Sequence, residues 1–526
     1  MVNWRQEIKA KKIWNSAPQC KTVSMSVTFG REESNCILRR RLSADFFVNS
    51  LPISRPSRPD RVRPPCRQQG VSQYPKKGLF TLSALDPSRD HSMTRILCAV
   101  AILAILAIRA TAAPPNVVMI IGDDQGWRDY GFMGHPHIKT PNLDKLAREG
   151  LVFPRGYVPS SLCRPSLASM ITGLYPHQHK ITCNDPPLPK GVAAGAANTN
   201  PLFLKQRQEM VAYIEKVPTL PRLLESHGYM SFQAGKWWEG NACRCGGFTA
   251  GMTHGEPDKN GRHGDEGLTI GRQGLKPVFD FLDQARAAGK PFYLWYAPMM
   301  PHLPHNPPER LLKRYTDKTK SIHIARYWAM CEWFDETIGD LLNKLEKSEQ
   351  ADNTIVVYLH DNGWIQDPDS PNFAPKSKRS AYDGGLRTPI IVKWAGKVKP
   401  AIRDDVVIST DLAPTLLLAT GLKPTAAMPG LDLRNPQALA ERKALFGEVF
   451  EHNAVEVHDP AKNLQYRWAI EGGWKLIVPH APNIPNGKPE LYELSHDPDE
   501  ATNLAATHPD QVARLREKLD QWWKPE

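Results

Sequence analysis

The sequence of 526 residues lacks the features of several large protein classes. It has no collagen-like Gly repeat and no internal repeat, and a hydrophobic fraction of 41% is too high for a disordered chain. The apolar run Ile96–Ile108 has only about 13 residues, whereas a helix needs ~20 to cross a bilayer. A phosphate-binding P-loop and a Gly-rich dinucleotide turn are also missing. The composition therefore indicates a globular protein whose length allows about two to four domains.

Most of the chain has no excess of positive or negative side chains. The formal net charge is +12, but residues 1–92 contain 17 Lys+Arg against 7 Asp+Glu, and Arg95 and Arg109 add two more positive charges. Residues 113–526 hold 48 basic and 48 acidic side chains. Because the main body is neutral, the net charge does not indicate a nucleic-acid partner.

The N-terminal part reads as two segments. Residues 1–92 are rich in Arg, Ser and Pro without lasting hydrophobic periodicity, which predicts an unstructured extension. Residues 93–112 have a short basic start, the apolar run and an Ala110-Thr111-Ala112 ending, as in a secretory signal peptide. We therefore expect translation to start at Met93, with residues 1–92 a mis-assigned start. The signal implies a periplasmic or secreted protein without a stable membrane span; an uncleaved membrane anchor is the alternative.

Cysteine is scarce in the remaining chain. Five are left after residue 112: Cys163, Cys183, Cys243, Cys245 and Cys331. An odd number leaves at least one thiol unpaired in an exported protein. Because Cys243 and Cys245 lack the two-residue gap of common zinc sites, we expect local disulfides or free thiols instead.

Hydrophobic patterning predicts an α/β fold over residues 113–434. Continuous apolar runs indicate buried strands at Asn116–Gly122, Phe292–Tyr296, Thr354–Leu359 and Pro389–Lys393. Between them lie helical patterns at Thr140–Gly150, with Thr140 as its cap, and along an amphipathic stretch from Tyr327 to Leu345. A further helix, Leu412–Ala419, follows the last of these strands and would be capped by Ser409 or Thr410. This alternation predicts a mostly parallel sheet covered by helices on both faces.

The tail from 435 to 526 differs in pattern. It contains short strand-like pieces followed by a terminal helix near Pro509–Trp522. We therefore expect a smaller C-terminal α+β domain.

Two predicted strands end in oxygen-bearing side chains. Asp123 and Asp124 follow the first strand, and Asp361 and Asn362 follow the strand Thr354–His360. Carboxyl ends of parallel strands meet at one edge of a sheet. Such ligands suit a hard cation, calcium or magnesium. Taken alone, Asp123-Asp124 would more readily be a turn or a helix cap than a metal site.

Cys163 stands just before a Pro-initiated helix that ends at Gly173. A helix N-terminus offers free N–H groups and a positive field, which favour an anion or an activated nucleophile. The alternative is a small buried cysteine without chemistry.

Seven ordered motifs resemble the sulfatase family of the alkaline-phosphatase-like superfamily, over about residues 114–526. They are Asn116–Trp127, Thr140–Gly150, Cys163–His177, Ala234–Trp237, His360–Gly363, Lys378–Pro389 and Glu490–Leu504. The resemblance implies an alkaline-phosphatase-like α/β fold and a sulfuric ester hydrolase.

The resemblance also implies roles for single residues. Cys163 would be converted by a formylglycine-generating enzyme into formylglycine, whose hydrated aldehyde is the nucleophile. One divalent ion, usually calcium and alternatively magnesium, would be bound by Asp123, Asp124, Cys163, Asp361 and Asn362. The sulfate group and the leaving oxygen would be held by Lys236, His302 and Lys378. The match of His302 is the least certain, because His305 lies three residues on.

These roles fit the chemistry of a sulfate ester. The ester is an anion and a weak electrophile, so a cation and two lysines stabilise the charge of the transition state. A geminal diol attacks sulfur with one hydroxyl and expels sulfate with the other. His302 or Lys378 would protonate the leaving alcohol or amine.

The sequence departs from the family pattern at two positions. Leu167 replaces the arginine of Cys-x-Pro-Ser-Arg, and Trp238 replaces the histidine of Lys-Trp-His. Substitutes for the arginine charge and the histidine base would be Arg164 and one of His177, His179 and His305.

The substrate implied is a sulfated carbohydrate carrying a sulfate ester or a sulfamate. Aromatic side chains beside the motifs would stack on sugar rings or belong to the core: Trp127, Tyr130, Trp237, Trp238 and Trp364. Two other functions stay open at this point. One is a phosphodiesterase or phosphonate hydrolase of the same superfamily, and the other is a non-catalytic binder of sulfated glycan.

Overall fold

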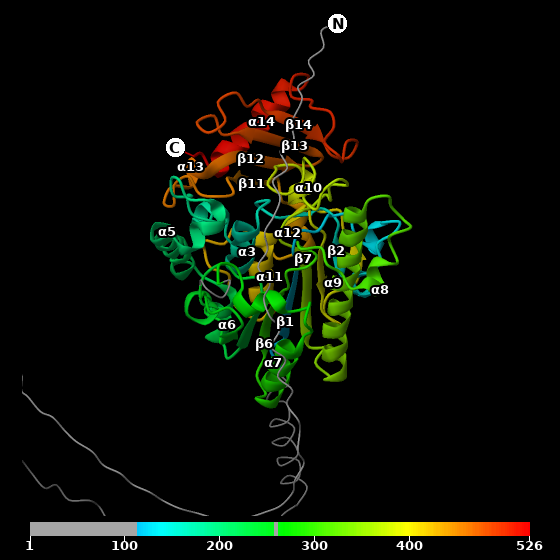
Figure 1. Ribbon diagram of the computed structural model, residues 1–526. Helices are drawn as coiled ribbons and strands as arrows, with labels where there is room; N and C mark the ends of the chain where they lie inside the picture. The colour runs from blue at the N-terminus through cyan, green and yellow to red at the C-terminus, as the bar shows by residue number, and fades with distance from the viewer. Residues whose placement is uncertain (1–112, 257–260, 526) are drawn as a thin grey trace, which may run out of the picture. The chain divides into compact units, whose positions relative to one another are not determined.

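The computed structural model describes residues 113–256 and 261–525 (Figure 1). The expected extension 1–92 and signal segment 93–112 lie outside the described residues and stay predictions. In the part that is described, no helix is both long enough and apolar enough to cross a membrane.

A central sheet of eight strands has the order β5-β4-β6-β1-β7-β8-β2-β9. Their bounds in that order are Ala250–Gly251, Met230–Gly235, Phe292–Ala297, Asn116–Gly122, Thr354–His360, Ile390–Lys393, Leu151–Phe153 and Ala401–Ile402. The strand β1 lies between β6 and β7 and is parallel to both. All seven of its residues are buried, as an apolar run with two covered faces requires. The predicted α/β fold is therefore confirmed, although β8 runs antiparallel to β7 and β2.

Helices cover both faces of this sheet (Figure 1). Side chains of β1 alternate between two cores, with Val117 and Met119 in one and Val118 and Ile120 in the other. The first core includes side chains of α3 (Cys163–Thr172), α6 (Leu220–Glu225) and α11 (Leu412–Ala419). The second includes those of α2 (Pro141–Glu149), α7 (Lys276–Ala287) and α9 (Ile322–Lys347).

The N-terminus of α2 is capped from a distant helix. Thr140, the expected cap, makes no side-chain cap bond, and its hydroxyl donates to Asp144 at 2.9 Å. Asp335 of α9 instead accepts from the N–H groups of Asn142 and Leu143 at 3.1 and 2.8 Å. The predicted caps of α11 are also wrong, since Ser409–Asp411 form a 3₁₀ turn that makes Asp411 the N-cap residue. A carboxylate supplied by the tertiary fold thus satisfies the free N–H groups of α2.

The C-terminal part forms an antiparallel sheet with the order β11-β12-β13-β14. Its strands are Leu445–Phe450, Leu464–Glu471, Trp474–Pro479 and Glu490–Glu493. The predicted terminal helix is α14 (Pro509–Trp522), which packs Leu515 and Leu519 against this sheet. The smaller α+β unit is present, while its boundary at residue 434 stays a prediction.

Short elements complete the described chain. The paired strands β3 and β10 are Gly156–Tyr157 and Val407–Ile408. The remaining α-helices, in the order α4, α5, α8, α10, α12 and α13, are Pro176–His179, Pro201–Val211, Glu309–Leu312, Asp383–Leu386, Pro436–Ala440 and Pro460–Asn463.

The cysteines of the described residues are all free thiols. Cys243 is exposed and Cys245 is buried on the π-helical turn Ala242–Gly246. Of the two alternatives left by the sequence, free thiols are therefore confirmed and local disulfides are not.

A buried lysine of the C-terminal sheet holds the segment that follows residue 378. The Nζ of Lys475, on β13, lies 2.8 Å from Asp383 Oδ1 and 2.9 Å from Glu500 Oε1. Asp383 is the first residue of α10, and all three side chains are buried. This triad ties β13, α10 and a C-terminal loop into one unit.

We expect Lys475→Met to lower the free energy of unfolding by about 3–5 kcal/mol, because it leaves two buried carboxylates without their shared cation. Urea denaturation measures the loss. The matched control is Lys488→Met at an exposed lysine of the same C-terminal unit, with little expected change. Equal stability of the two variants would contradict a structural role for the triad.

Candidate active site

Two strand ends bring four predicted ligands together. Asp123 and Asp124 follow β1, and Asp124 has a φ of +60°, which interrupts the alternation of side chains along the strand. Asp361 and Asn362 follow β7. The N–H of Asp124 donates to Asp361 Oδ1 at 3.3 Å, and Asn362 Nδ2 donates to Asp124 Oδ1 at 2.7 Å. The four side chains therefore converge at one edge of the sheet, as parallel neighbours should.

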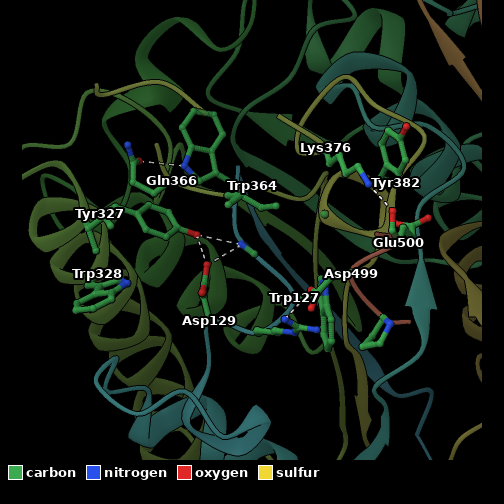
Figure 2. Close-up of a pocket in the computed structure, with 16 residues that line it drawn as sticks. Trp127, Asp129, Tyr327, Trp328, Trp364, Gln366, Lys376, Tyr382, Asp499 and Glu500 are labelled. Carbon is green, nitrogen blue, oxygen red and sulfur yellow. Dashed lines mark hydrogen bonds and ion pairs between the residues drawn. The ribbon is translucent and has the colours of Figure 1, made fainter. Parts of the chain in front are cut away.

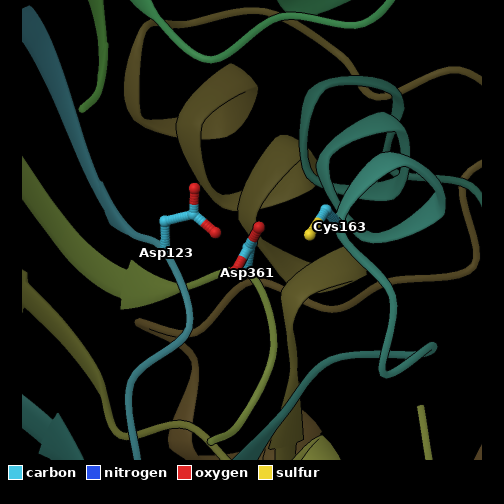
Figure 3. Close-up of side chains that lie close together, drawn as sticks. All are labelled: Asp123, Cys163 and Asp361. Atoms are coloured by element: carbon cyan, nitrogen blue, oxygen red, sulfur yellow. The ribbon is translucent and has the colours of Figure 1, made fainter. Parts of the chain in front are cut away.

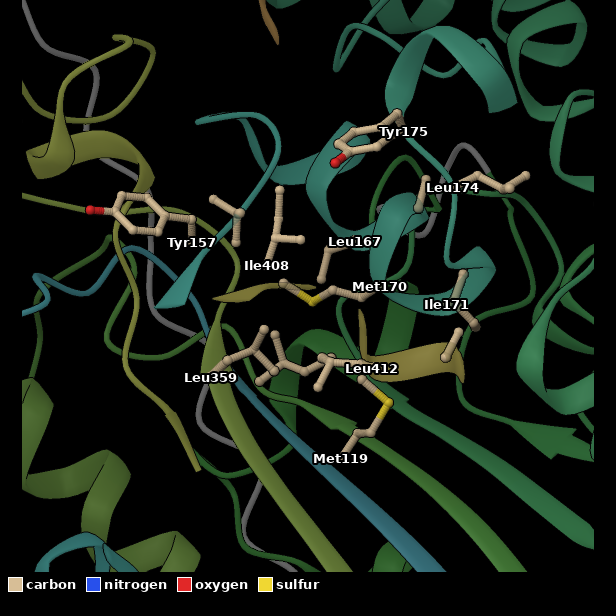
Figure 4. Packing of buried hydrophobic residues seen from close by; sticks show 14 of the residues in the cluster. Met119, Tyr157, Leu167, Met170, Ile171, Leu174, Tyr175, Leu359, Ile408 and Leu412 are labelled. Carbon is tan, nitrogen blue, oxygen red and sulfur yellow. The ribbon is translucent and has the colours of Figure 1, made fainter. Parts of the chain in front are cut away.

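Cys163 faces this cluster from the first turn of α3 (Figure 3). Its Sγ, one oxygen of Asp123 and one oxygen of Asp361 all lie within 4.8 Å of one another. Apolar residues of α3 pack in the same core as Met119 and Leu359 of the ligand-bearing strands (Figure 4). The position of residue 163 is thus fixed by core packing.

The thiol of Cys163 is poorly suited to act as a nucleophile itself. Its side chain is only 2% exposed. Burial raises the pKa of the Cys163 thiol to about 12, although Lys236 and Lys378 act in the opposite direction. At neutral pH it is therefore a neutral thiol, whereas the reactive form of cysteine is the thiolate.

Two lysines balance the buried carboxylates. Lys236 follows β4, and its Nζ donates to both oxygens of Asp123 at 2.8 and 2.7 Å. Lys378 Nζ donates to Asp124 Oδ1 at 2.5 Å and to Cys163 Sγ at 3.1 Å. Burial alone would lower the pKa of each lysine, but Asp123 and Asp124 hold these pKa values above the usual range. Both lysines are therefore cations inside the cluster.

His302, and not His305, lies at the cluster. Its Nε2 is 3.3 Å from Asp124 Oδ2, and its Nδ1 is 2.7 Å from the carbonyl oxygen of Leu303. Arg272 holds this loop by donating to the carbonyl oxygens of His302 and Met299 at 2.7 and 2.9 Å. The conformation of the loop after β6 thus brings His302, and not His305, to the cluster.

The donor set fits a divalent cation. When all three carboxylates are ionised, as they are once a cation displaces the proton of Asp361, two lysines leave one negative charge uncompensated in a buried space. Asp361 Oδ2 and Asn362 Oδ1 are buried, and neither has a hydrogen-bond partner in the described part of the chain, although Lys236 Nζ lies 3.6 Å from Asp361 Oδ2 as an ion pair. Burial, and then the charge of Asp123, raises the pKa of Asp361 to about 8. A hard cation would satisfy both orphaned oxygens and remove this repulsion.

At the two positions that depart from the family pattern, the replacing side chains are buried in the protein interior. Leu167 is buried in the apolar core. Trp238 is 5% exposed, and its ring lies 4.5 Å from the guanidinium carbon of Arg262. Arg164 does not take over the missing charge, because it donates to Glu239 at 2.6 and 2.7 Å in a buried ion pair.

Two of the suggested substitute histidines are engaged elsewhere. His177 Nδ1 lies 2.7 Å from Glu448 Oε1, and its ring stacks on Trp523 at 4.6 Å. His179 Nε2 lies 3.0 Å from the hydroxyl of Ser169. Neither interpretation is supported by the contacts that these side chains make.

A pocket of about 360 Å³ lies beside the cluster (Figure 2). Loops that continue from the ligand-bearing strand ends form two walls, with Trp127 in one and Trp364 in the other. The ring of Trp364 also lies 5.9 Å from Lys378 Nζ. Of the aromatic side chains expected beside the motifs, these two line the pocket, whereas Tyr130, Trp237 and Trp238 are buried in the protein core.

Other lining residues were not found from the sequence. Tyr327 and Trp328 belong to α9, where helical periodicity indicated only core packing. Tyr382 and Glu500 come from the segments joined by Lys475. Nothing local marks such residues, because the pocket forms only when these distant segments meet.

Comparisons with known proteins identify the family and the fold. The sulfatase family model matches residues 115–422, and the model for the C-terminal region of N-sulphoglucosamine sulphohydrolase matches residues 374–524. The N-acetylgalactosamine-6-sulfatase of Canis lupus familiaris is 29% identical over 362 residues, which are 61% of this chain and 65% of the canine protein. The chain thus spans just under two thirds of that relative's length.

A bacterial relative and a solved structure match over longer stretches. The N-acetylgalactosamine-6-O-sulfatase of Bacteroides thetaiotaomicron is 26% identical over 510 residues, which are 77% of this chain and 92% of that protein. The crystal structure of Ps i-CgsB matches with a TM-score of 0.61 and 23% identity, covering 78% of this chain and 94% of that one. This structural likeness shows the shared fold.

We expect Ca²⁺ to bind on the order of 50-fold more tightly at pH 8 than at pH 6, because a proton on Asp361 competes with the ion. The raised pKa means that the metal-free folded state holds this proton more firmly than the unfolded chain does. Without Ca²⁺, the free energy of unfolding should therefore fall as pH rises from about 4 to 8. Calorimetry in two buffers of different ionisation enthalpy should show about one proton released per ion at pH 7.

The control for this prediction is an exposed carboxylate near the same strand end. Asp361→Asn should weaken Ca²⁺ binding and abolish its pH dependence, whereas Asp369→Asn should change neither. Ca²⁺ affinity that is equal at both pH values would argue against Asp361 as a ligand.

Proposed function

Because the chain belongs to the sulfatase family, we propose that it removes sulfate from a sulfated carbohydrate, as an ester or alternatively a sulfamate. The observation that carries the proposal is the buried cluster of Cys163, three carboxylates, Asn362 and two lysines. Such a cluster combines a cation site with positive side chains around residue 163, which is what an anionic ester requires.

Because the neutral thiol of Cys163 is a poor nucleophile, we assign that role to formylglycine, the oxidised form of this residue, whose hydrated aldehyde supplies a hydroxyl. Lys378 Nζ, 3.1 Å from the side chain of residue 163, is placed to donate a hydrogen bond to that position. Because the Cys163 side chain is only 2% exposed, a formylglycine-generating enzyme would act before α3 packs against the sheet.

Calcium, or alternatively magnesium, would be held by Asp123, Asp124, Asp361, Asn362 and the side chain at residue 163. When bound, it supplies positive charge for the sulfate oxygens. Two lysines of the chain add to this positive charge. Lys236 forms an ion pair with Asp123, and Lys378 forms one with Asp124. With a divalent ion bound and Asp361 ionised, three carboxylates, two lysines and the ion leave one excess positive charge, which attracts an anionic substrate.

His302 is placed to protonate the leaving oxygen. Both of its ring nitrogens face oxygens, one from Leu303 and one from Asp124, an arrangement that the imidazolium form satisfies. Burial lowers the pKa of His302, although Asp123 and Asp124 oppose this effect. A lowered pKa makes the proton of the imidazolium easier to transfer, as a general acid requires.

Three observations support a carbohydrate as the leaving group. The neighbouring pocket offers aromatic faces and polar edges, as sugar sites do. The canine and bacterial relatives are both named as sulfatases of N-acetylgalactosamine. Ps i-CgsB, which shares the fold, has been crystallised with k-i-k-neocarrahexaose.

The signal-like segment 93–112 supports a periplasmic or secreted location.

The first test is the mass of the peptide that contains residue 163. After expression with the native maturation system, it should be lighter by about 18 Da than the cysteine peptide, as formylglycine formation requires. Peptides containing Cys245, another buried thiol, should keep the cysteine mass. An unmodified residue 163 in active enzyme would contradict the proposed nucleophile.

The second test is loss of activity by substitution. Cys163→Ala and Asp361→Ala should each lower kcat for a sulfated sugar by at least about 1,000-fold, because one removes the nucleophile and the other a cation ligand. Circular dichroism should show an unchanged fold, and Cys245→Ala should remain active. A matched phosphate ester, turned over faster than the sulfate ester, would favour the phosphodiesterase alternative.

A further inference from the structure

A second cavity, of about 480 Å³, adjoins the loop that carries His302. It is lined by Leu303, Pro304, His305, His323, Arg326 and Pro371. His302 turns toward Asp124, while His305, three residues on, lines this cavity. Three residues span at most about 11 Å, so the cavity lies within reach of a substrate held at His302.

His305 is a buried side chain without a polar partner. It is 9% exposed, and both of its ring nitrogens lack a hydrogen-bond partner among residues 113–256 and 261–525. Its ring packs between Tyr327 and Trp364, with centroid distances of 5.5 and 6.0 Å. A buried unpaired imidazole costs free energy, which indicates that another group binds there.

Arg272 fixes this histidine's loop. It donates to the carbonyl oxygen of Pro304 at 3.2 Å as well as to that of His302. The same guanidinium therefore holds the segment that presents His302 to the cluster and His305 to the cavity.

The lining of the cavity has one permanent positive charge, that of Arg326. His323 and Arg326 project from the first turns of α9, Arg326 is exposed, and the six lining residues include no carboxylate. Burial, together with the charges of His302, Arg272 and His323 and against the opposing charge of Asp124, lowers the pKa of His305 to about 4. The surroundings of His305 are thus short of negative charge, and an oxyanion would supply it.

Building on the proposed function, we propose that His305, His323 and Arg326 bind a second oxyanion of the same saccharide. This group is a carboxylate or sulfate on the unit next to the one that loses its sulfate. The substrate class is then a polyanionic chain rather than a singly sulfated neutral sugar. Arg326 supplies a permanent charge and His305 a donor within the buried part of the cavity.

The turnover test compares three disaccharides with the same scissile sulfate. One has no other charge, one has a uronic carboxylate on the adjacent unit, and one has a second sulfate there. The wild type should show about tenfold higher kcat/KM for at least one doubly charged substrate, and the preferred one identifies the oxyanion. Arg326→Gln should remove this advantage while leaving the singly charged substrate unchanged.

Two further variants make the test specific. His305→Asn should act like Arg326→Gln, and Arg326→Gln keeps the test valid if the buried substitution harms folding. The matched control is Lys347→Gln, at an exposed cation on the far end of α9, which should keep the wild-type preference.

A binding measurement is independent of turnover. In the Cys163→Ala background, calorimetry should give about tenfold tighter binding of the preferred doubly charged disaccharide, and Arg326→Gln should abolish the difference. Equal affinities for all three disaccharides would overturn this inference and leave water as the partner of His305. Failure of the wild type to release sulfate from any of them would instead contradict the proposed function.

Discussion

The convergence of three carboxylates in a buried space is the constraint on which the site depends. Asp123, Asp124 and Asp361 are each at most 2% exposed. Like charges so placed repel strongly unless cations compensate them. Lys236 and Lys378 neutralise two of the three carboxylate charges. The third carboxylate charge has no compensating lysine, and this makes the cluster a cation site. The amide of Asn362 and the first turn of α3 occupy the other sides of the same space.

The two structural units share in building this cluster. Lys378 stands on a segment that the C-terminal unit holds in two ways, through Lys475 at Asp383 and through the carbonyl oxygen of Glu500 at Lys376. The pocket beside the cluster uses the same contacts, since Lys376, Tyr382 and Glu500 line it. A substitution that shifts the C-terminal sheet would therefore move both Lys378 and the lining of the pocket beside the cluster.

The positions that depart from the family pattern show how packing changes a charged site. Leu167 and Trp238 are buried among apolar and aromatic side chains, and Arg164 is neutralised by Glu239. Positive charge close to residue 163 therefore comes from Lys236 and Lys378. Beyond His302, the second cavity is lined by His305 from the same loop and by Arg326 from α9.

The sequence by itself determined what depends on local pattern. Buried strands, the amphipathic helix α9 and the strand-end residues Asp123, Asp124, Asp361 and Asn362 were all predicted, because periodicity and strand ends are properties of neighbouring residues. The tertiary structure alone decided the antiparallel direction of β8, the capping of α2 by Asp335, the partner of Arg164 and the choice of His302 over His305. Each of these joins residues far apart in the chain, and such contacts arise only when the sheet and its covering helices bring the segments together.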